Sequence, residues 1–512
     1  MNREILPARL YVAAFVGGLV SLALELAAAR LLAPAFGTSE LVWSAIIGLI
    51  LLYLSVGYVV GGRWADRSPR RATLYTLLVG AGLAIGVIPF VAQPALRLAA
   101  RGMLQWNAGQ VVGPFIAVLI LFAVPVTLLA CVSPFVIRLG MRDLHTSGVT
   151  AGRVYAISTA GSFLGTFLPN LVLVPLIGTR RTFLLLAMVA AATGVWGLWR
   201  ADRRRFWLLI WTLPLLVGLL LLKPGAIKPR PGLIHEEESA HNLIQVVENE
   251  RGARFLLLNE GQGVHSVYVP DGVLTGGTWD YFLIAPYFNP PPYRPQDVDS
   301  LLVIGLAAGT IPDQYTEIYG PIPIDGVEID PAIIEVGREY FEMTQPNLNV
   351  YAADGRAFLQ CTEGSYDVVA VDAYRLPYIP WHLTTVEFFQ EIAAHLTAEG
   401  VVAINVGHTP EDWRLVAAMV ATLEQVFPST HVVAVPETFN AIVVATAQPT
   451  RAGHLEANLV HLEEPHLRAV AGRALANLVE IAPGRPIFTD DRAPVELLTD
   501  ALVLNYVLGA RP

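Results

Sequence analysis

Three carboxylates in the C-terminal half of the chain stand where short apolar runs end. Glu328, Asp354 and Asp372 each lie at, or within two residues of, the end of such a run. Runs of this kind are typical of buried parallel strands, and ligands of open α/β sheets bind beyond the carboxyl ends of those strands. Three negative charges grouped there would be costly without a ligand or partners, so we expect them to form a site. The alternative is that all three are ordinary solvated acids in loops.

A glycine-bounded turn follows the first of these strands. Leu301–Ile304 leads directly into Gly305-Leu306-Ala307-Ala308-Gly309, whose small residues would let a cofactor approach the backbone. Glu328 lies 23 residues after Gly305, a spacing at which an acid holds a ribose diol in nucleotide-binding folds. The alternative is a turn that needs glycine only for its own geometry.

The elements that must position these residues alternate along the chain. Short strands are predicted first at Leu243–Val247, Phe255–Leu258 and Val264–Val269. Further strands are predicted at Leu301–Ile304, Ile324–Ile329, Val350–Ala352, Val368–Asp372, Val401–Asn405, His431–Val435 and Ala441–Ala445, with helices between them such as Ala332–Phe341, Val386–His395 and Trp413–Val426. Solid apolar strands that alternate with helices indicate a doubly wound parallel sheet.

An ordered series of motifs in this half resembles the spermidine synthase (polyamine aminopropyltransferase) family in its membrane-fused form. The matching residues are Glu238-Ser239, Leu256–Ser266 (LLLNEGQGVHS), Gly305–Gly309, Val327–Asp330, Asp354-Gly355, Val371-Asp372 and Thr489–Glu496 (TDDRAPVE). The resemblance implies a Rossmann-like, class I methyltransferase-type α/β domain with a leading β-hairpin platform.

The resemblance also implies roles for the site residues. Gly305, Gly309 and Gly355 would lie against an S-adenosyl-type nucleoside, whose ribose hydroxyls Glu328 would hold. Asp354 would accept a hydrogen bond from the adenine amino group, and Asp372 would be the base that takes a proton from an attacking amine. The co-substrate would be decarboxylated S-adenosylmethionine or S-adenosylmethionine, and no metal is expected. A base is needed because a primary ammonium titrates near ~10.4 and must lose a proton before it can attack.

The chain departs from the family pattern on the amine side of the site. Ala308 stands where the family's glycine loop carries an Asp, Trp279-Asp280-Tyr281 replaces the usual Tyr-His-Glu, and Arg375 replaces the second acid of the usual Asp-Ser-x-Asp-Pro loop. An Arg beside a dicationic polyamine is repulsive by ~1 kcal/mol or more at a partly buried distance. We therefore expect Asp280 and Arg375 to shape the acceptor pocket, and spermidine is not the expected substrate.

The N-terminal part of the chain has a different composition. Hydrophobic residues make up 54% of the chain and charged residues only 15%, against roughly 25% charged in an ordinary soluble protein. A membrane span needs ~20 mostly apolar residues. Seven candidates are Leu10–Leu32, Leu41–Gly61, Ala72–Ala92, Val111–Cys131, Val154–Ile177, Thr182–Trp199 and Phe206–Leu222. The predicted organisation is an N-terminal α-helical transmembrane bundle of about seven spans over residues 1–222, a linker over 223–234, and the α/β domain over 235–512.

The charge distribution and the expected co-substrate predict opposite sides of the membrane for the C-terminal domain. Residues 1–222 carry a net charge of +12, whereas residues 223–512 carry −21. The loops on the N-terminal side hold 13 Arg and Lys and those on the other side eight, so the positive-inside rule places the N-terminus in the cytoplasm and, after seven spans, the C-terminal domain outside. A cytosolic nucleoside co-substrate requires the opposite. The acidic domain should repel phosphate backbones, so we expect no nucleic-acid binding.

Three functions stay open at this point. The first is a membrane-bound transferase that moves an aminopropyl group from a decarboxylated S-adenosylmethionine-type donor to an amine acceptor. The second is an S-adenosylmethionine-dependent methyltransferase, which would need no polyamine pocket and would tolerate Ala308. The third is a non-catalytic module of a membrane complex or transporter, which an outward-facing domain would favour. The expected partners are the lipid bilayer and either a small amine or a membrane protein, and a homo-oligomer is one open arrangement.

Overall fold

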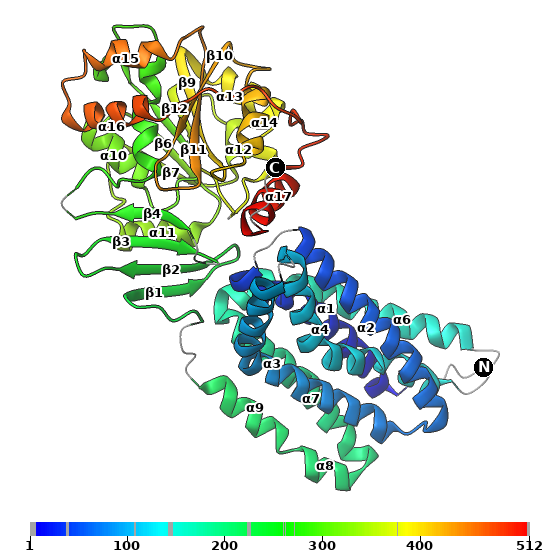
Figure 1. The fold of residues 1–512 in the computed structure, drawn as a ribbon. Coiled ribbons are helices and arrows are strands. Elements are labelled where there is room, and N and C mark those ends of the chain that lie inside the picture. The colour runs from blue at the N-terminus through cyan, green and yellow to red at the C-terminus, as the bar shows by residue number, and fades with distance from the viewer. Residues whose placement is uncertain are drawn as a thin grey trace. The chain divides into compact units, whose positions relative to one another are not determined.

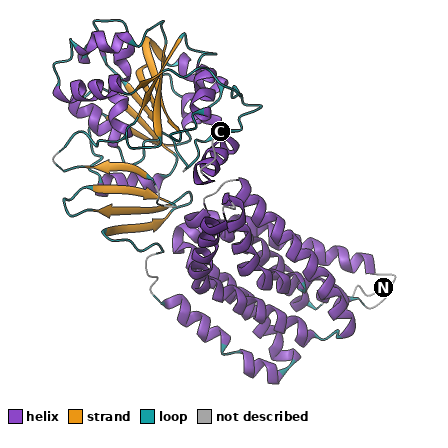
Figure 2. Ribbon diagram, viewed as in Figure 1, coloured by secondary structure: helices purple, strands orange, loops and turns teal. Residues whose placement is uncertain are grey.

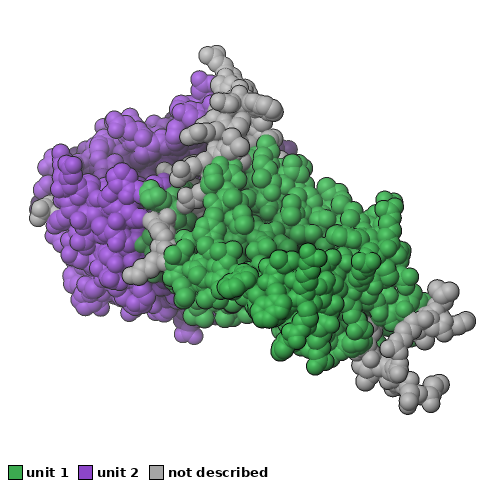
Figure 3. All heavy atoms as spheres, turned by 90° about the horizontal axis from the view of Figure 1, so that it is seen from below, with its two compact units in different colours: residues 1–229, 236–243 green, residues 230–235, 244–512 purple. Residues whose placement is uncertain are grey.

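The computed structural model describes residues 7–36, 40–106, 109–141, 147–222, 227–259, 261, 263–270, 272–375 and 377–508. Part of the predicted linker 223–234 lies outside these ranges, as do Glu260 and Gln262 of the LLLNEGQGVHS motif. The chain divides into two compact units, which Figure 3 colours separately. The first comprises residues 1–229 and 236–243, and the second comprises residues 230–235 and 244–512.

Every described element between residues 8 and 221 is a helix (Figure 2). These are α1 (Ala8–Phe36), α2 (Glu40–Arg67), α3 (Arg71–Trp106), α4 (Gly109–Ala130), α5 (Val132–Gly140), α6 (Ser147–Leu168), the π-helical turn η2 (Pro169–Leu173), α7 (Val174–Ala201), α8 (Arg203–Leu209) and α9 (Thr212–Leu221). α1 packs along α6, and α3 along α7. A Cβ atom at Gly161 of α6 would lie 2.1 Å from the carbonyl oxygen of Phe15 in α1, so glycine lets the two backbones touch, as is common in membrane bundles.

Six described segments are long and apolar enough to cross a membrane, where the sequence predicted seven. The difference lies in Ser147–Ala201, a single run of 55 residues that contains two of the predicted spans, Val154–Ile177 and Thr182–Trp199. The run is continuous because η2 joins α6 directly to α7. Its backbone nevertheless leaves the helical conformation at Gly178, with φ 78° and ψ 164°.

The outer surface of these helices is also apolar. Leu171, Leu176, Trp211 and Leu221 are between 68% and 75% exposed. A surface of this kind is unfavourable in water, because contiguous apolar area is normally buried. Together with the length of the segments, it indicates a membrane protein.

A small sheet follows the helices in the chain. Its strands are β1 (Leu233–Glu238), β2 (Leu243–Glu248), β3 (Arg254–Leu258) and β4 (Val264–Tyr268), adjacent in chain order. β2, β3 and β4 confirm the three short strands predicted here, and β1 starts within the predicted linker. The sheet packs through Ile244, Val246 and Leu256 against α11 (Pro331–Tyr340), which places the platform next to the main sheet.

The main sheet has eight strands in the order β12-β10-β11-β9-β8-β5-β6-β7. They are β5 (Leu301–Ile304), β6 (Ile324–Glu328), β7 (Leu348–Ala352), β8 (Tyr366–Val371), β9 (Leu396–Gly407), β10 (Ser429–Ala434), β11 (Asn440–Thr446) and β12 (Leu478–Val479). β5 to β9 are parallel, as predicted, and this part is Rossmann-like.

The far edge of the sheet corrects the prediction of an all-parallel arrangement. β11 runs antiparallel to β9, and β10 antiparallel to β11. Only residues 435–439 connect β10 to β11. Because a parallel pair needs a crossover of a dozen or more residues, this connection can form only a hairpin.

Helices cover both faces of the sheet (Figure 1). One face packs against α13 (Val386–Ala394), α14 (Arg414–Leu423) and α17 (Val495–Leu508). The other packs against η3 (Thr278–Phe288), α10 (Thr310–Tyr319), α15 (Gly453–Leu459) and α16 (Pro465–Ala476). Two covered faces explain why the central strand β5 is a solid apolar run that is buried throughout.

Candidate active site

The glycine turn after β5 is held tightly against the end of β8. Gly305 has a φ of 89°, and a Cβ atom there would lie 2.6 Å from the backbone nitrogen and Cα of Ala373. Gly309 has a φ of 90°, and a Cβ atom on it would meet Met343 at 2.7 Å. Glycine is therefore required at both ends of the turn, by conformation and by space.

Glu328 closes this turn from the end of β6. Its Oε2 accepts from the backbone N–H of Ala307 at 2.9 Å, and its Oε1 accepts from the N–H of Asp330 at 3.1 Å. Burial raises the pKa of Glu328 to about 7, although these two amides oppose the shift. Each carboxylate oxygen has a second lone pair, so the side chain can brace the turn and still accept from a ligand hydroxyl.

Asp354 caps the helix that follows β7, α12 (Gly355–Leu359). Its Oδ1 accepts from the N–H groups of Arg356 at 3.0 Å and Ala357 at 3.1 Å, and its Oδ2 lies 2.9 Å from Nε2 of His382. Burial alone would raise the pKa of Asp354, but these hydrogen bonds outweigh it, so the pKa lies below its usual value. Gly355 allows the close packing here, since a Cβ atom would lie 2.3 Å from Cγ2 of Ile304.

Asp372 follows β8 and lies beside the glycine turn. Its Oδ1 accepts from Nδ2 of Asn405 at 2.8 Å, and the side chain of Trp279 donates a second hydrogen bond. Asn405 is held in turn by Nδ2 of Asn440 at 2.7 Å. Burial raises the pKa of Asp372 to about 7 against these opposing bonds. A carboxyl group with this pKa can exchange a proton near neutral pH.

Asp280 lies elsewhere in the fold. Its carboxylate is fully buried and accepts five hydrogen bonds, from Thr275, Gly276, Gln314 and Arg473. These partners fix the start of η3 against α10 and α16. The expectation that Asp280 shapes an acceptor pocket is therefore not supported, because its oxygens are already used within the protein.

Arg375 and Ala308 occupy two different environments. Arg375 is exposed in the loop after β8, where its backbone pairs with that of Tyr378. Ala308 is 2% exposed, its N–H donates to Oγ of Ser266 at 2.9 Å, and its methyl group packs in the core between the platform and α11. An Asp side chain at position 308 would bury a charge in that core, which explains why alanine fits here.

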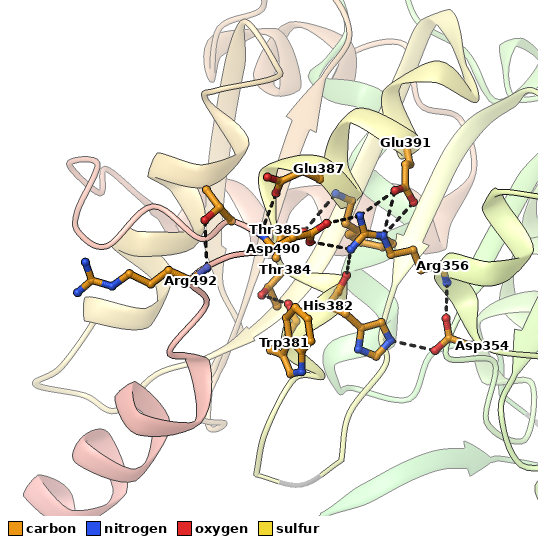
Figure 4. A network of polar contacts seen from close by, with 12 residues as sticks. Asp354, Arg356, Trp381, His382, Thr384, Thr385, Glu387, Glu391, Asp490 and Arg492 are labelled. Carbon is orange, nitrogen blue, oxygen red and sulfur yellow. Dashed lines mark hydrogen bonds and ion pairs between the residues drawn. The ribbon is translucent and has the colours of Figure 1, made fainter. Parts of the chain in front are cut away.

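Several polar residues of the site were not singled out from the sequence. His382, Arg356 and Asp490 form a connected network with Asp354 (Figure 4). Asp490 lies in the TDDRAPVE motif, so the charges of that motif were a usable signal. Asn405 lies in an ordinary strand pattern and His382 in an ordinary loop pattern, so neither residue carried a signal in the sequence. Among the described residues, no group of three or more His, Cys, Asp or Glu could hold a metal ion.

The part of the chain that carries this site is similar to known proteins. Residues 302–453 match the family described as Spermine/spermidine synthase domain. The chain is 30% identical over 284 residues to a probable polyamine aminopropyl transferase of Bifidobacterium longum, covering 52% of this chain and 62% of that protein. It is 32% identical over 209 residues to a polyamine aminopropyltransferase of Vibrio vulnificus, covering 37% and 65%. The chain thus spans less than two thirds of the length of either relative.

Two further similarities are more distant. The eEF1A lysine and N-terminal methyltransferase of Homo sapiens is 29% identical over 163 residues, which is 29% of this chain and 23% of that protein. The crystal structure of a probable spermidine synthase from Corynebacterium glutamicum is 20% identical and covers 51% of this chain and 100% of that one, with a TM-score of 0.39. The family match includes Gly305, Glu328, Asp354 and Asp372. Residues 302–453, within the second unit, are therefore similar to the Spermine/spermidine synthase domain family.

Proposed function

We propose that the second unit is a membrane-anchored transferase of the aminopropyltransferase type, which uses a decarboxylated S-adenosylmethionine-type donor and an amine acceptor. The observation that carries the proposal is the position of Asp372 beside the glycine turn together with the raised pKa of its carboxyl group. Asp372 stands at a parallel strand end, its backbone carbonyl carbon lies 2.7 Å from where a Cβ atom of Gly305 would be, and the pKa of its carboxyl group is raised to about 7. A base of this strength beside a nucleoside-binding turn suits the deprotonation of an amine.

The donor would bind along the ends of β5, β6 and β7. Glu328 would accept from its ribose hydroxyls and Asp354 from the exocyclic amino group of its base. Gly305, Gly309 and Gly355 would allow the backbone to approach it. The free lone pairs on the two carboxylates and the tight glycine turn support this placement.

In the proposed step, Asp372 takes one proton from the acceptor ammonium. The freed nitrogen lone pair attacks the methylene carbon next to the sulfonium, so a C–N bond forms. The C–S bond breaks, and its electron pair goes to the sulfur of methylthioadenosine, the leaving group. The proton on Asp372 then passes to solvent. Since a sulfonium leaves readily, positioning of nitrogen and carbon supplies much of the rate.

The acceptor is expected to differ from a long polyamine. Arg375 is exposed in the loop that follows Asp372, and it would repel a second cationic end. An amine with one cationic end, or with an anionic group as well, is therefore the proposed substrate class.

A methyltransferase is the second candidate, favoured by the similarity to a human methyltransferase and by the buried alanine at position 308. Both candidates are tested by incubating the purified full-length protein with an amine mixture and either decarboxylated S-adenosylmethionine or S-adenosylmethionine. Mass spectrometry would show an aminopropyl or a methyl addition to the acceptor. If neither donor reacts and calorimetry detects no binding of methylthioadenosine at millimolar concentration, the non-catalytic alternative is correct.

The unit of helices is proposed to anchor the domain in the cell membrane on the side that supplies the nucleoside. An even number of crossings would put both chain ends on one side, and an odd number would separate them. A C-terminal green fluorescent protein fusion should fluoresce if the domain is cytoplasmic. A dark fusion, with an active alkaline phosphatase fusion at the same position, would contradict a catalytic role with a cytosolic donor.

A further inference from the structure

His382 holds the outer oxygen of Asp354. It lies in η5 (Trp381–Leu383), in the long connection between β8 and α13, and its Nε2 is 2.9 Å from Oδ2 of Asp354. The two side chains are about one-third exposed, His382 at 32% and Asp354 at 34%. The other oxygen of Asp354 is already occupied by the first amides of α12. The carboxylate therefore has donors on both oxygens and a defined rotamer, yet it remains accessible to a ligand.

The segment that carries His382 is itself held by an arginine between two acids (Figure 4). Arg356 donates to both oxygens of Asp490, at 2.7 and 2.8 Å, and to both oxygens of Glu391, at 2.8 to 3.0 Å. It also donates to the carbonyl oxygen of His382 at 3.4 Å. Thr385 donates from Oγ1 to Asp490 at 2.7 Å. Bidentate contacts of this kind are rigid and directional, so the loop has a fixed position relative to α12.

We propose that His382 is a positioning residue that sets the base specificity of the nucleoside site. The inference rests on the proposed function. His382 fills one of the two acceptor directions of Oδ2 on Asp354, which leaves the other to accept from the ligand. An exocyclic amino group on the base would donate to it. A keto group at the same position would bring two acceptors together and be repelled.

The test compares two probes that differ in this group, methylthioadenosine and methylthioinosine, by calorimetry on the full-length protein. The wild type should prefer the adenosine probe by ~10–100-fold, the value of a hydrogen bond to a charged group. In His382→Ala that preference should fall to within ~3-fold, because no donor then holds Oδ2 of Asp354 in place. His382→Gln keeps a hydrogen-bond donor at this position, so part of the preference for the adenosine probe should remain. Asp490→Asn should reduce the preference less than His382→Ala does, since Asp490 acts only through Arg356.

The matched control is Arg338→Ala, which removes an exposed ion pair with Glu335 on a helix away from this network. It should leave both affinities within ~2-fold of the wild type. A purely structural role of His382 would weaken both probes by the same factor, and an unchanged preference in His382→Ala would overturn the proposal while leaving the proposed function intact. If the wild type binds neither probe, the proposed function falls and this inference falls with it.

Discussion

Asp354 and Asp372, at the two ends of the candidate site, are the same residue type in different electrostatic environments. Asp354 and Asp372 both follow parallel strands of one sheet, within hydrogen-bonding reach of donors. Asp354 is an N-cap with three donors, and its pKa is lowered, so it stays ionised and can act as a constant acceptor. Asp372 accepts from fewer donors, and desolvation by burial outweighs them, so the pKa of its carboxyl group rises to about 7. The number of donors on each carboxylate, set against its burial, therefore shifts the two pKa values in opposite directions, which suits the binding and base roles that we propose.

The largest effect is expected from removing the base. Asp372→Asn keeps the shape and the contact with Asn405 but loses the proton acceptor, so turnover should fall by ~10²–10⁴-fold with nucleoside affinity nearly unchanged. Product mass spectrometry and calorimetry on the same preparation separate the two effects. Glu335→Gln, on the exposed face of α11, is the control and should leave turnover unaltered. A variant that loses nucleoside affinity as well would place Asp372 on the binding end of the site.

A smaller effect is expected from a substitution at the nucleoside-binding end of the site. Glu328→Gln removes the charge that would hold the ribose but keeps an acceptor for the amide of Ala307, so nucleoside affinity should fall by ~1–3 kcal/mol. Turnover at saturating donor should change much less than in Asp372→Asn. Calorimetry with methylthioadenosine measures the nucleoside affinity, and initial rates at saturating donor measure the turnover. An unaltered affinity would show that Glu328 only braces the turn.

The raised pKa of Asp372 predicts a pH dependence of both rate and stability. Turnover should increase as pH rises through about 7, because the base form then accumulates. The stability changes in the opposite direction. The folded pKa lies above the unfolded value, so the contribution of Asp372 to stability is fully present below about pH 4 and is lost as pH rises through about 7. Thermal midpoints of Asp372→Asn should therefore rise relative to the wild type between pH 5 and pH 8. A constant difference would contradict the raised pKa.

The smallest effect concerns the acceptor. Arg375→Ala should raise the rate with putrescine relative to a monoamine by ~3–10-fold, which corresponds to the loss of a repulsion of ~1 kcal/mol. Competition between the two amines, followed by mass spectrometry, gives the ratio directly. If the wild type already prefers putrescine and the variant does not change that preference, Arg375 lies too far from the acceptor to select it.

The order of elements in the second unit was available from the sequence. Buried parallel strands are mostly apolar, so β5 to β9 could be located from short, largely apolar runs between helices, although β7 is partly exposed. The turn at Gly305 and the acids Glu328, Asp354 and Asp372 followed from their positions at strand ends. The antiparallel edge was not recognised, although the short connection between His431–Val435 and Ala441–Ala445 was visible. In the first unit, a helix that continues through η2 cannot be told from two separate spans by composition.

Side-chain partners were decided only by the tertiary structure. Asp280 and Asp372 were both expected at the site, yet Asp280 accepts five hydrogen bonds in the core, whereas the backbone of Asp372 lies against Gly305. Asp490 reaches Arg356 across 134 residues of chain. Local sequence sets the periodicity that makes a strand or helix, because that depends on neighbouring residues. Donors, burial and hence the pKa of a carboxylate depend on residues that only folding brings together.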